Sequence, residues 1–358
     1  MTAPAILIVG GYGVVGKQVA ALLAERNPQL EIWIGGRALD KAEEVATTLP
    51  RARAVQIDMD TADPLEKLEM LPDVIVALAN DDHDHLLVAA ARRGIALIDI
   101  TRWTERMRIA IDRLATIPLT APVILASGWM AGVPATIAAQ LAKSMSAIGI
   151  INIDILYALK DKAGPNSIAY ADRLNIPFSI HSAGQLQTVK PLTEPRSVRF
   201  SNDRILDCYR FDTPDQFTLV EHLGASGVST RLTYDDAVTV NLMRFLLRSG
   251  LWSLLSLSIF RKLRHSLLFN PGEGAPHEII LEMVGQTLDK DPVTHRVTII
   301  DPQGQTHMTA AGVVAQAERV LTLHRREAPR SGLSFPEQLT DPPKALTALR
   351  EMGVTISF

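Results

Sequence analysis

The sequence predicts an α/β protein with two parts: a doubly wound parallel sheet, and then an α+β domain with a mostly antiparallel sheet. Three observations predict this. Short apolar runs alternate with helix-like segments over the first 130 residues, and a glycine-rich turn joins the first such run to the first helix. After residue 150, strand-like runs follow one another across Gly and Pro turns. We therefore expect domains at residues 1–130 and 131–325.

The first strand, helix and turn carry a nucleotide-binding pattern. Residues 6–9 are an apolar run typical of a buried strand, and residues 14–26 form an amphipathic helix. Between them lies G-x-G-x-x-G, in the context that the Rossmann fingerprint requires. Gly11 would allow the tight turn, Gly13 the approach of a pyrophosphate, and Gly16 close helix packing; the helix N-terminus would offer its N–H groups. The predicted cofactor contacts here are Gly11, Tyr12, Gly13, Val14, Val15 and Gly16. The alternative is a tight turn that binds nothing.

The end of the second strand bears on the type of cofactor. An NAD site usually has Asp or Glu there to hold the ribose 2′-hydroxyl. After residues 31–35 this chain instead has Gly36-Arg37, and an arginine fork suits a 2′-phosphate. The predicted cofactor is NADP, and NAD is the alternative. For Arg37 itself, the alternative to phosphate binding is an exposed, solvated side chain with no ligand. Asp40 is predicted to cap a helix over residues 41–48.

Four further apolar runs, at residues 54–57, 73–78, 94–100 and 122–126, complete the predicted parallel sheet. Its carboxyl edge is where such sheets bind ligands. The cofactor contacts predicted at this edge are Asp58, Ala79, Asn80, Ser127 and Gly128. Asp58 could equally cap a turn, whereas Ser127 and Gly128 offer backbone groups near a nicotinamide.

Two features that suggest metal or thiol chemistry have simpler explanations. The run Asp81-Asp82-His83-Asp84-His85 begins a predicted helix, where acids suit the positive end of the dipole. His83 and His85 are two residues apart and do not share a helix face, so no metal site is predicted. The single cysteine, Cys208, excludes an intramolecular disulfide and is expected to be a buried apolar residue.

Several motifs together resemble the saccharopine dehydrogenase-like oxidoreductases. Besides the glycine turn and Gly36-Arg37, they are the strand-end acids Asp58 and Asp99, Gly128…Gly132-Val-Pro134, Thr309-Ala-Ala-Gly312 and Gly332-Leu-Ser-Phe-Pro-Glu337. The resemblance spans nearly the whole chain. It implies an NAD(P)-dependent enzyme whose α+β domain carries much of the substrate site. It also implies hydride transfer at an imine or carbonyl carbon of an amino-acid-like substrate, and a tail, residues 326–358, that returns to the Rossmann domain.

The elements of the second domain are predicted from the alternation of apolar and polar residues and from the Gly and Pro residues that separate these stretches. Strands are expected at residues 151–159, 184–189, 197–200, 205–211, 217–222, 278–285 and 295–301. Helices are expected at 166–174, at 237–263 with a break near Ser249-Gly250, and at 310–325. We expect its sheet to face the first domain across a cleft, since domain interfaces are favoured ligand sites.

A nicotinamide enzyme must position the acceptor carbon and manage one proton. The candidate proton donors are Asp99, Tyr157, Lys160 and His181. Each also has a structural explanation: Asp99 could cap a turn and Tyr157 could be a core residue. Lys160 could lie at a solvated strand end, and His181 could be a loop histidine. Arg102 and Arg173 are candidates for binding a substrate carboxylate, because arginine suits bidentate recognition. His181 is grouped with them as a possible substrate contact.

Charge and targeting signals limit the partners. The formal net charge of −3 gives no reason to expect nucleic acid. No signal peptide is visible, so we expect a cytoplasmic protein with a small-molecule substrate, and a homodimer is reasonable. The apolar residues 251–260, with Arg248 before them and Arg261 after, are too few to span a bilayer; a buried or interface helix is expected, with peripheral membrane contact as the alternative.

Two other functions remain open from the sequence. One is a nucleotide-binding regulator or membrane-associated scaffold without turnover, suggested by the weak set of acid and base candidates. The other is a lipid-modifying reductase that would use the apolar residues 251–260 as an acyl-chain wall.

Overall fold

The structure, a computed structural model, describes residues 3–161, 173–260, 272–324, 331–338 and 341–358. The chain divides into two compact units. Unit 1 comprises residues 1–133 and 309–338, and unit 2 comprises residues 134–308 and 339–358. Helices α5 (Trp129–Ala142) and α11 (Gln305–His324) carry the chain from one unit to the other. The sequence predicted a boundary after residue 130, and the family resemblance implied a tail, residues 326–358, that returns to the first domain; here residues 309–338 belong to unit 1 and the last twenty residues to unit 2.

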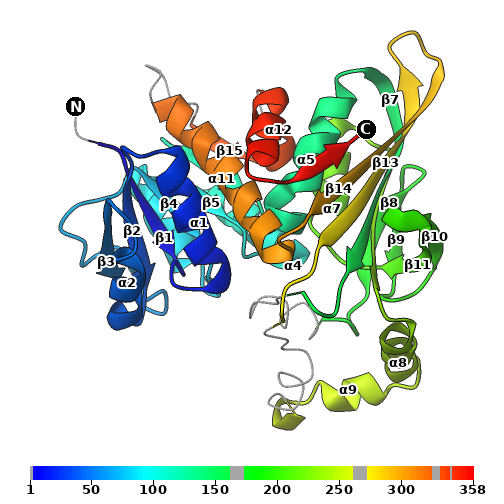
Figure 1. The fold of residues 1–358 in the computed structure, drawn as a ribbon, viewed down its shortest axis with the longest axis horizontal. Helices are drawn as coiled ribbons and strands as arrows, with labels where there is room; N and C mark the ends of the chain where they lie inside the picture. Colours follow the sequence, from blue (N-terminus) through cyan, green and yellow to red (C-terminus); the bar gives the residue numbers. More distant parts are fainter. Residues whose placement is uncertain (1–2, 162–172, 261–271, 325–330, 339–340) are drawn as a thin grey trace. The chain divides into compact units, whose positions relative to one another are not determined.

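Unit 1 contains a parallel sheet of seven strands in the order β15-β6-β5-β4-β1-β2-β3 (Figure 1). The strands are β1 (Ala5–Val9), β2 (Glu31–Gly36), β3 (Ala52–Gln56), β4 (Val74–Ala77), β5 (Ala96–Asp99), β6 (Pro122–Leu125) and β15 (Gly332–Ser334). The helices between them are α1 (Val14–Arg26), α2 (Leu39–Ala46), α3 (His85–Arg93) and α4 (Thr104–Leu114). The predicted doubly wound sheet is confirmed. Its order reverses at β1, which pairs with β2 on one side and β4 on the other.

The central strands of unit 1 are apolar because they are covered on both faces. Every residue of β1, β4, β5 and β6 is buried, and the four strands read AILIV, VIVA, ALID and PVIL. Near-continuous apolar runs are typical of parallel strands packed between helices. The edge strand β3 reads ARAVQ and has no buried residue.

Unit 2 contains a second seven-stranded sheet, in the order β10-β11-β12-β7-β13-β14-β16. Its strands are β7 (Met145–Tyr157), β10 (Arg196–Arg199), β11 (Ile205–Arg210), β12 (Gly227–Tyr234), β13 (His277–Thr287), β14 (Pro292–Asp301) and β16 (Thr355–Ser357). Only β7 and β12 are parallel neighbours among these strands. A separate hairpin pairs β8 (Phe178–Ser182) with β9 (Gln185–Val189). The predicted, mostly antiparallel second sheet is therefore confirmed.

The helices of unit 2 are α7 (Asp215–Leu223), α8 (Ala237–Arg248), α9 (Leu251–Leu255) and α12 (Pro342–Glu351), besides its part of α5 and the start of α11. Gly250 separates α8 from α9 in the left-handed conformation, at the predicted break. Cys208 is fully buried in a cluster with Leu156, Phe200 and Ile280. This burial raises the pKa of the Cys208 thiol, as expected for an inert core residue.

Some local predictions were wrong. Residues 217–222 are not a strand but lie in α7, which follows Pro214 and ends at a left-handed Gly224. These are helix start and stop signals that outweigh the short alternation of Phe217 and Leu219. Asp40 is not a cap but the second residue of α2, where it still faces the positive helix end. The strands β8 and β12 were missed, and the helix predicted at 166–174 falls largely outside the described residues.

A left-handed turn follows β6 and is held by the tail. Met130, Ala131 and Gly132 all have positive φ, of 51°, 55° and 78°. A Cβ on Gly132 would lie 2.3 Å from Cγ of Pro336, and one on Gly312 of α11 would lie 2.4 Å from the Met130 carbonyl oxygen. Because β15 pairs in parallel with β6, the tail is brought to this turn. Three motifs that are far apart in the sequence therefore meet here.

We predict that Gly132→Ala lowers the free energy of unfolding by about 2–4 kcal/mol, because a left-handed alanine costs about 1 kcal/mol and the clash with Pro336 adds an overpacking cost. Gly224→Ala is the matched control. Gly224 is also left-handed, but its Cβ would have no neighbour within 4 Å, so only the smaller backbone cost applies. Urea unfolding measures both variants. Equal losses would show that the contact with Pro336 is unimportant.

Candidate functional site

The glycine turn between β1 and α1 is tightly packed on the protein side and open on the other. Gly10, directly before the predicted turn glycine Gly11, has φ +86° and so takes the left-handed conformation in this turn. A Cβ on Gly11 would lie 2.9 Å from the Ile8 carbonyl oxygen, and one on Gly16 would lie 2.3 Å from that of Gly10. Gly13, by contrast, is exposed, and only the Gly10 oxygen lies near its Cβ position, at 3.1 Å. The turn thus leaves its open side at the N-terminus of α1, whose first turn contains no acid.

At the end of β2, Tyr12 and Arg37 shape the surface next to this turn. The Tyr12 ring lies against Gly36, whose Cβ would be 2.3 Å from the ring carbon Cε1. The Ala38 N–H donates to the Tyr12 hydroxyl oxygen at 3.4 Å. Arg37 lies 3.5 Å from Asp60, and both side chains are about 75% exposed. A pair this exposed is weak, so the guanidinium can turn to a phosphate at little cost.

The other strand ends predicted to contact the cofactor have different surroundings. Asp58 is exposed and accepts a hydrogen bond from the Asp60 N–H at 3.1 Å, which is the turn-capping role left open by the sequence. Ala79 lies beside the glycine turn, 3.3 Å from the Cβ position of Gly10. Asn80 is half-buried at the end of β4. Ala79 and Asn80 thus lie at the sheet's carboxyl edge, at the switch point beside β1.

Arg102 and Asp99 form the centre of a buried ion-pair cluster. Arg102 is 2% exposed; its Nε donates to Asp99 at 2.7 Å and its Nη1 to Asp84 at 2.5 Å. Asp99 also accepts from the N–H and the hydroxyl of Thr101, at 2.9 and 2.8 Å. Burial by itself would lower the pKa of Arg102, but the carboxylates of Asp99 and Asp84 raise it above the ordinary value. The side chains of both residues thus already have hydrogen-bond partners within the protein. This favours a structural role over proton donation by Asp99 or substrate binding by Arg102.

Ser127 ties this cluster to the end of β6. Its hydroxyl accepts from the Arg102 N–H at 3.0 Å and donates to the Asp99 carbonyl oxygen at 3.2 Å. Arg106 donates to Asp84 at 2.7 Å and to the Asp81 carbonyl oxygen at 2.8 Å. The loops after β4, β5 and β6 are therefore held together, so that Ser127 and Gly128 have a fixed place at the sheet edge.

The acid and histidine run before α3 caps that helix. The Asp81 carboxylate accepts from the N–H groups of His85 and Leu87, at 2.8 and 3.0 Å. The His85 ring nitrogen Nδ1 lies 3.2 Å from the Met59 carbonyl oxygen. Within the described parts of the chain, no group of three or more His, Cys, Asp or Glu is placed to hold a metal ion.

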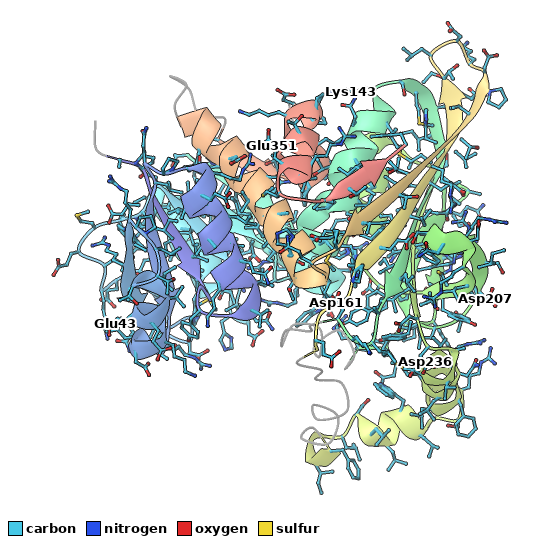
Figure 2. All side chains as sticks on the ribbon, viewed as in Figure 1. Glu43, Lys143, Asp161, Asp207, Asp236 and Glu351 are labelled. Atoms are coloured by element: carbon cyan, nitrogen blue, oxygen red, sulfur yellow. The ribbon has the colours of Figure 1, made fainter. Side chains whose placement is uncertain are left out.

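In unit 2, a polar cluster gathers around Tyr157, where β7 ends. The Gln305 side-chain amide donates to the Tyr157 hydroxyl oxygen at 2.6 Å, and the Gln305 N–H donates to Asp161 at 2.8 Å. The Tyr157 ring meets those of Tyr234 and His277 edge-on, with centroids 5.4 and 6.4 Å away. Asp161 is 1% exposed and lies near the start of α11 (Figure 2).

Sequence reasoning missed His277 and Gln305, because they come from segments more than a hundred residues from Tyr157. The signal available was weak: a lone histidine at the start of a strand and a glutamine at the start of a helix. His277 is fully buried, and this burial lowers its pKa to about 3. The imidazole is therefore neutral near pH 7.

The remaining predicted residues lie apart along unit 2. Lys160 is in an exposed turn, with its Nζ 3.8 Å from Glu273 and the two side chains 78% and 86% exposed. Arg173 is half-buried at the edge of the described chain, and His181 is half-buried on β8. The exposure of Lys160 matches the solvated strand end considered from the sequence.

A second buried polar group, also missed, lies on one face of the unit 2 sheet. Arg210 and Arg231 both donate to the Ser229 hydroxyl oxygen, at 2.6 and 2.7 Å. Asp154 is fully buried and forms an ion pair with Arg196, and burial raises the pKa of this carboxyl to about 6. The alternation of Ile151, Ile153 and Ile155 was the signal that places Asp154 on the opposite face.

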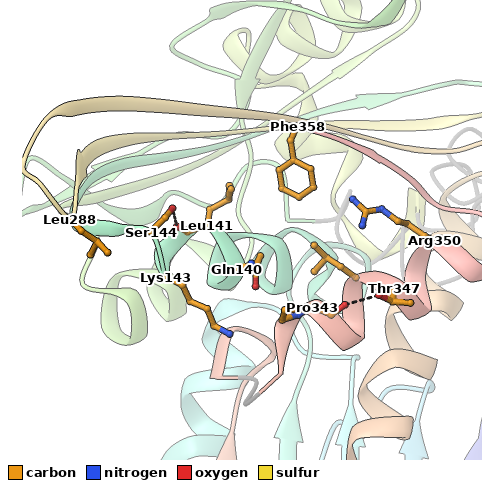
Figure 3. A pocket seen from close by; sticks show the side chains of 10 residues that line it. Gln140, Leu141, Lys143, Ser144, Leu288, Pro343, Thr347, Arg350 and Phe358 are labelled. Carbon is orange, nitrogen blue, oxygen red and sulfur yellow. Dashed lines mark hydrogen bonds between the residues drawn. The ribbon is translucent and has the colours of Figure 1, made fainter.

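A pocket of about 540 Å³ is lined by α5, α12 and the turn between β13 and β14 (Figure 3). Its cations are Lys143 and Arg350, and Leu288 and Phe358 are among its apolar lining residues. The Arg350 guanidinium carbon lies 5.7 Å from the centroid of the Phe358 ring. None of the residues predicted from the sequence to form a site lines this pocket.

Comparison with known proteins confirms the resemblance seen in the motifs. Residues 6–115 match the family model described as the saccharopine dehydrogenase NADP binding domain. The fold matches apo saccharopine dehydrogenase (L-Glu forming) from Saccharomyces cerevisiae with a TM-score of 0.68 and 14% identity, over 99% of each chain. No curated protein sequence matches the chain.

More distant structural matches include a myo-inositol dehydrogenase from Corynebacterium glutamicum, covering 98% of this chain and 94% of that one. An amine dehydrogenase from Mycobacterium smegmatis covers 95% and 96%. Both have a TM-score of 0.47 and 14% identity. At these identities the structural likeness concerns the fold alone.

We predict that His277 makes the protein sensitive to acid. Its pKa is about 3 in the folded chain and near the ordinary 6.5 when unfolded, so the stability it contributes is present above pH 6.5 and is lost as the pH falls towards 3. The resulting difference in unfolding free energy is at most about 5 kcal/mol. His277→Gln should flatten the pH profile of stability in this window, whereas exposed His83→Gln should not. Parallel profiles for wild type and His277→Gln would contradict the assignment.

Proposed function

We propose that the protein is an NADP-dependent oxidoreductase that transfers a hydride to or from an imine or carbonyl carbon of a small, amino-acid-like substrate. One observation carries the proposal: a glycine turn that is closely packed at Gly16 and open at Gly13, at the N-terminus of α1. The family model that covers residues 6–115 is that of an NADP-binding domain, which supports the same conclusion.

The cofactor contacts we propose follow the carboxyl edge of the unit 1 sheet. Residues 11–16 would hold the pyrophosphate through backbone N–H groups. Arg37 would bind the 2′-phosphate, since β2 ends in two glycines with no carboxylate at its tip. Ala79, Asn80, Ser127 and Gly128 would contact the nicotinamide half. When bound, the nicotinamide supplies or accepts the hydride, and the chain's own groups position the substrate and manage the proton.

Among the predicted proton donors, the geometry favours Tyr157. Asp99 is engaged by protein groups, since it accepts two hydrogen bonds from Thr101 and one from Arg102. Lys160 is exposed and strongly solvated. A tyrosine hydroxyl is protonated at neutral pH, and Gln305 fixes the oxygen of Tyr157 in place. Arg173 and His181 remain the candidates for substrate contact, and Arg102 is left out because carboxylates enclose it.

The main alternative is a nucleotide-binding protein without turnover. It is favoured by one observation: a predicted proton donor, Asp99, and a predicted substrate-binding residue, Arg102, both serve the buried ion-pair cluster. A lipid-modifying reductase is the other alternative, and exposed apolar residues on α8 and α9 favour it. The cytoplasmic location and the homodimer stay predictions from the sequence.

The proposal predicts that the protein binds NADPH more tightly than NADH, and that Arg37→Ala removes this preference. A hydrogen-bonded ion pair with phosphate is worth about 1.5–3 kcal/mol, so NADPH affinity should fall by about 10- to 100-fold while NADH affinity stays the same. Titration followed by tryptophan fluorescence measures both. The control is Arg51→Ala, an exposed arginine elsewhere in unit 1. Failure of wild type to bind either nucleotide would end the proposal.

A second prediction concerns the proton donor. Tyr157→Phe should lower kcat by about 100-fold or more and leave NADPH affinity unchanged, because general acid catalysis typically contributes that much. Turnover is first sought with wild type over a panel of amino acid and keto acid pairs. Tyr234→Phe, which alters the neighbouring ring of the same cluster, is the control and should retain most activity. Cofactor binding by wild type without turnover on any pair would favour the regulatory alternative.

A further inference from the structure

The outward side of α8 is apolar. Val238, Leu242 and Phe245 are 74%, 55% and 61% exposed. They follow one another at spacings of four and three residues, so they form a single stripe along the helix. A helix on a protein surface ordinarily turns such a stripe to the core and its polar residues to water. The stripe on α8 faces the other way.

The same surface continues along α9 and the short helix η2 (Ser258–Phe260). Leu251, Leu254, Leu257 and Ile259 are 43%, 57%, 52% and 80% exposed. With the stripe on α8 they make seven exposed apolar side chains within 22 residues, which we term the α8–α9 surface. Large exposed apolar surfaces mark binding sites for proteins or membranes.

The opposite side of α8 is packed against the rest of unit 2. Val240 and Met243 on the opposite side of α8 are buried, and so is Trp252 of α9. The Arg244 guanidinium lies 4.2 Å over the Tyr209 ring and donates to its hydroxyl oxygen at 2.9 Å. Asp236, which begins α8 (Figure 2), accepts from the Thr239 N–H at 2.8 Å. The inner face thus fixes α8, and the apolar stripe is held outward.

The charge of residues 237–272 indicates which kind of partner the α8–α9 surface binds. From residue 237 to residue 272 the sequence contains no Asp or Glu, although the whole chain has a formal net charge of −3. Within the described part the cations are Arg244 and Arg248, and Arg248 is exposed. The sequence then adds Arg261, Lys262 and Arg264, which lie outside the described residues. Two copies packed through this surface would bring like charges together, whereas an anionic lipid surface complements them.

We infer that the α8–α9 surface docks on the face of an anionic lipid membrane, with its apolar side chains among the acyl chains and Arg248 at the headgroups. The helices would lie in the plane of the interface. No described helix is long and apolar enough to cross a bilayer. The inference does not depend on the proposed cofactor or reaction.

The test is sedimentation of the full chain with phosphatidylcholine vesicles, with and without phosphatidylserine. We expect binding to the anionic vesicles only. The triple variant Phe245→Gln, Leu254→Gln, Ile259→Gln should bind more than about tenfold more weakly, because each removed side chain takes apolar area away from the interface. The matched control, Leu186→Gln, Ile205→Gln, Leu288→Gln, alters residues that are 62%, 60% and 67% exposed elsewhere in unit 2 and should bind like wild type.

A second pair of variants tests the charge. Arg248→Glu should weaken anionic-vesicle binding several-fold and make it less salt-dependent, whereas exposed Lys190→Glu should not. Absence of wild-type binding, equal binding to neutral vesicles, or full binding by the first triple variant would each overturn the inference. So would a dimer in solution that this triple variant dissociates and that does not bind vesicles, since the occupant would then be a second copy. NADPH titration of the same variants reports separately on the proposed function.

Discussion

The close packing of backbone at Gly16 is the contact on which unit 1 depends. No side chain fits there, since a Cβ would lie 2.3 Å from the Gly10 oxygen. This lets α1 start directly over the end of β1, in the middle of the sheet, where the strand order reverses. At that point the loops on the two sides of β1 diverge and leave room for a ligand. The same packing thus builds the sheet and places a helix N-terminus where phosphates can bind.

The carboxyl edge of this sheet is held together by polar and charged side chains that the sequence suggested as catalytic or binding residues. Arg102 joins the acids after β4 and β5, Ser127 joins β6 to them, and the left-handed turn at residues 130–132 is held against Pro336 and Gly312. A buried ion pair between an arginine and carboxylates is costly to break, because removal of one partner leaves an uncompensated buried charge. Such an edge suits a cofactor that must be held in one pose. It also means that protein groups already engage both Asp99 and Arg102.

The sequence predicted the elements whose signals are local. The glycine turn, the apolar parallel strands and the break at Gly250 follow from residues close together in the chain, and the structure has them within a few positions. The errors arose where two local signals compete or are absent. Residues 217–222 alternate like a strand, but Pro214 and Gly224 bound a helix. In β12, the buried Ser229 and Arg231 interrupt the apolar pattern; they are hydrogen-bonded to each other, and Ser229 also accepts from Arg210 of β11, which the local sequence does not indicate.

By itself, then, the sequence determined the two-part fold class, the nucleotide-binding turn and the cationic, acid-free character of residues 237–272. Those are properties of chain-local composition and spacing. Tertiary structure alone decided the state of each polar side chain: Arg102 is enclosed by acids, Asp161 is buried, and Tyr157 is held by Gln305. It also decided that the apolar side of α8 faces outward. The physical reason is that burial and hydrogen-bond partners depend on segments brought together from distant parts of the chain, and no local pattern records them.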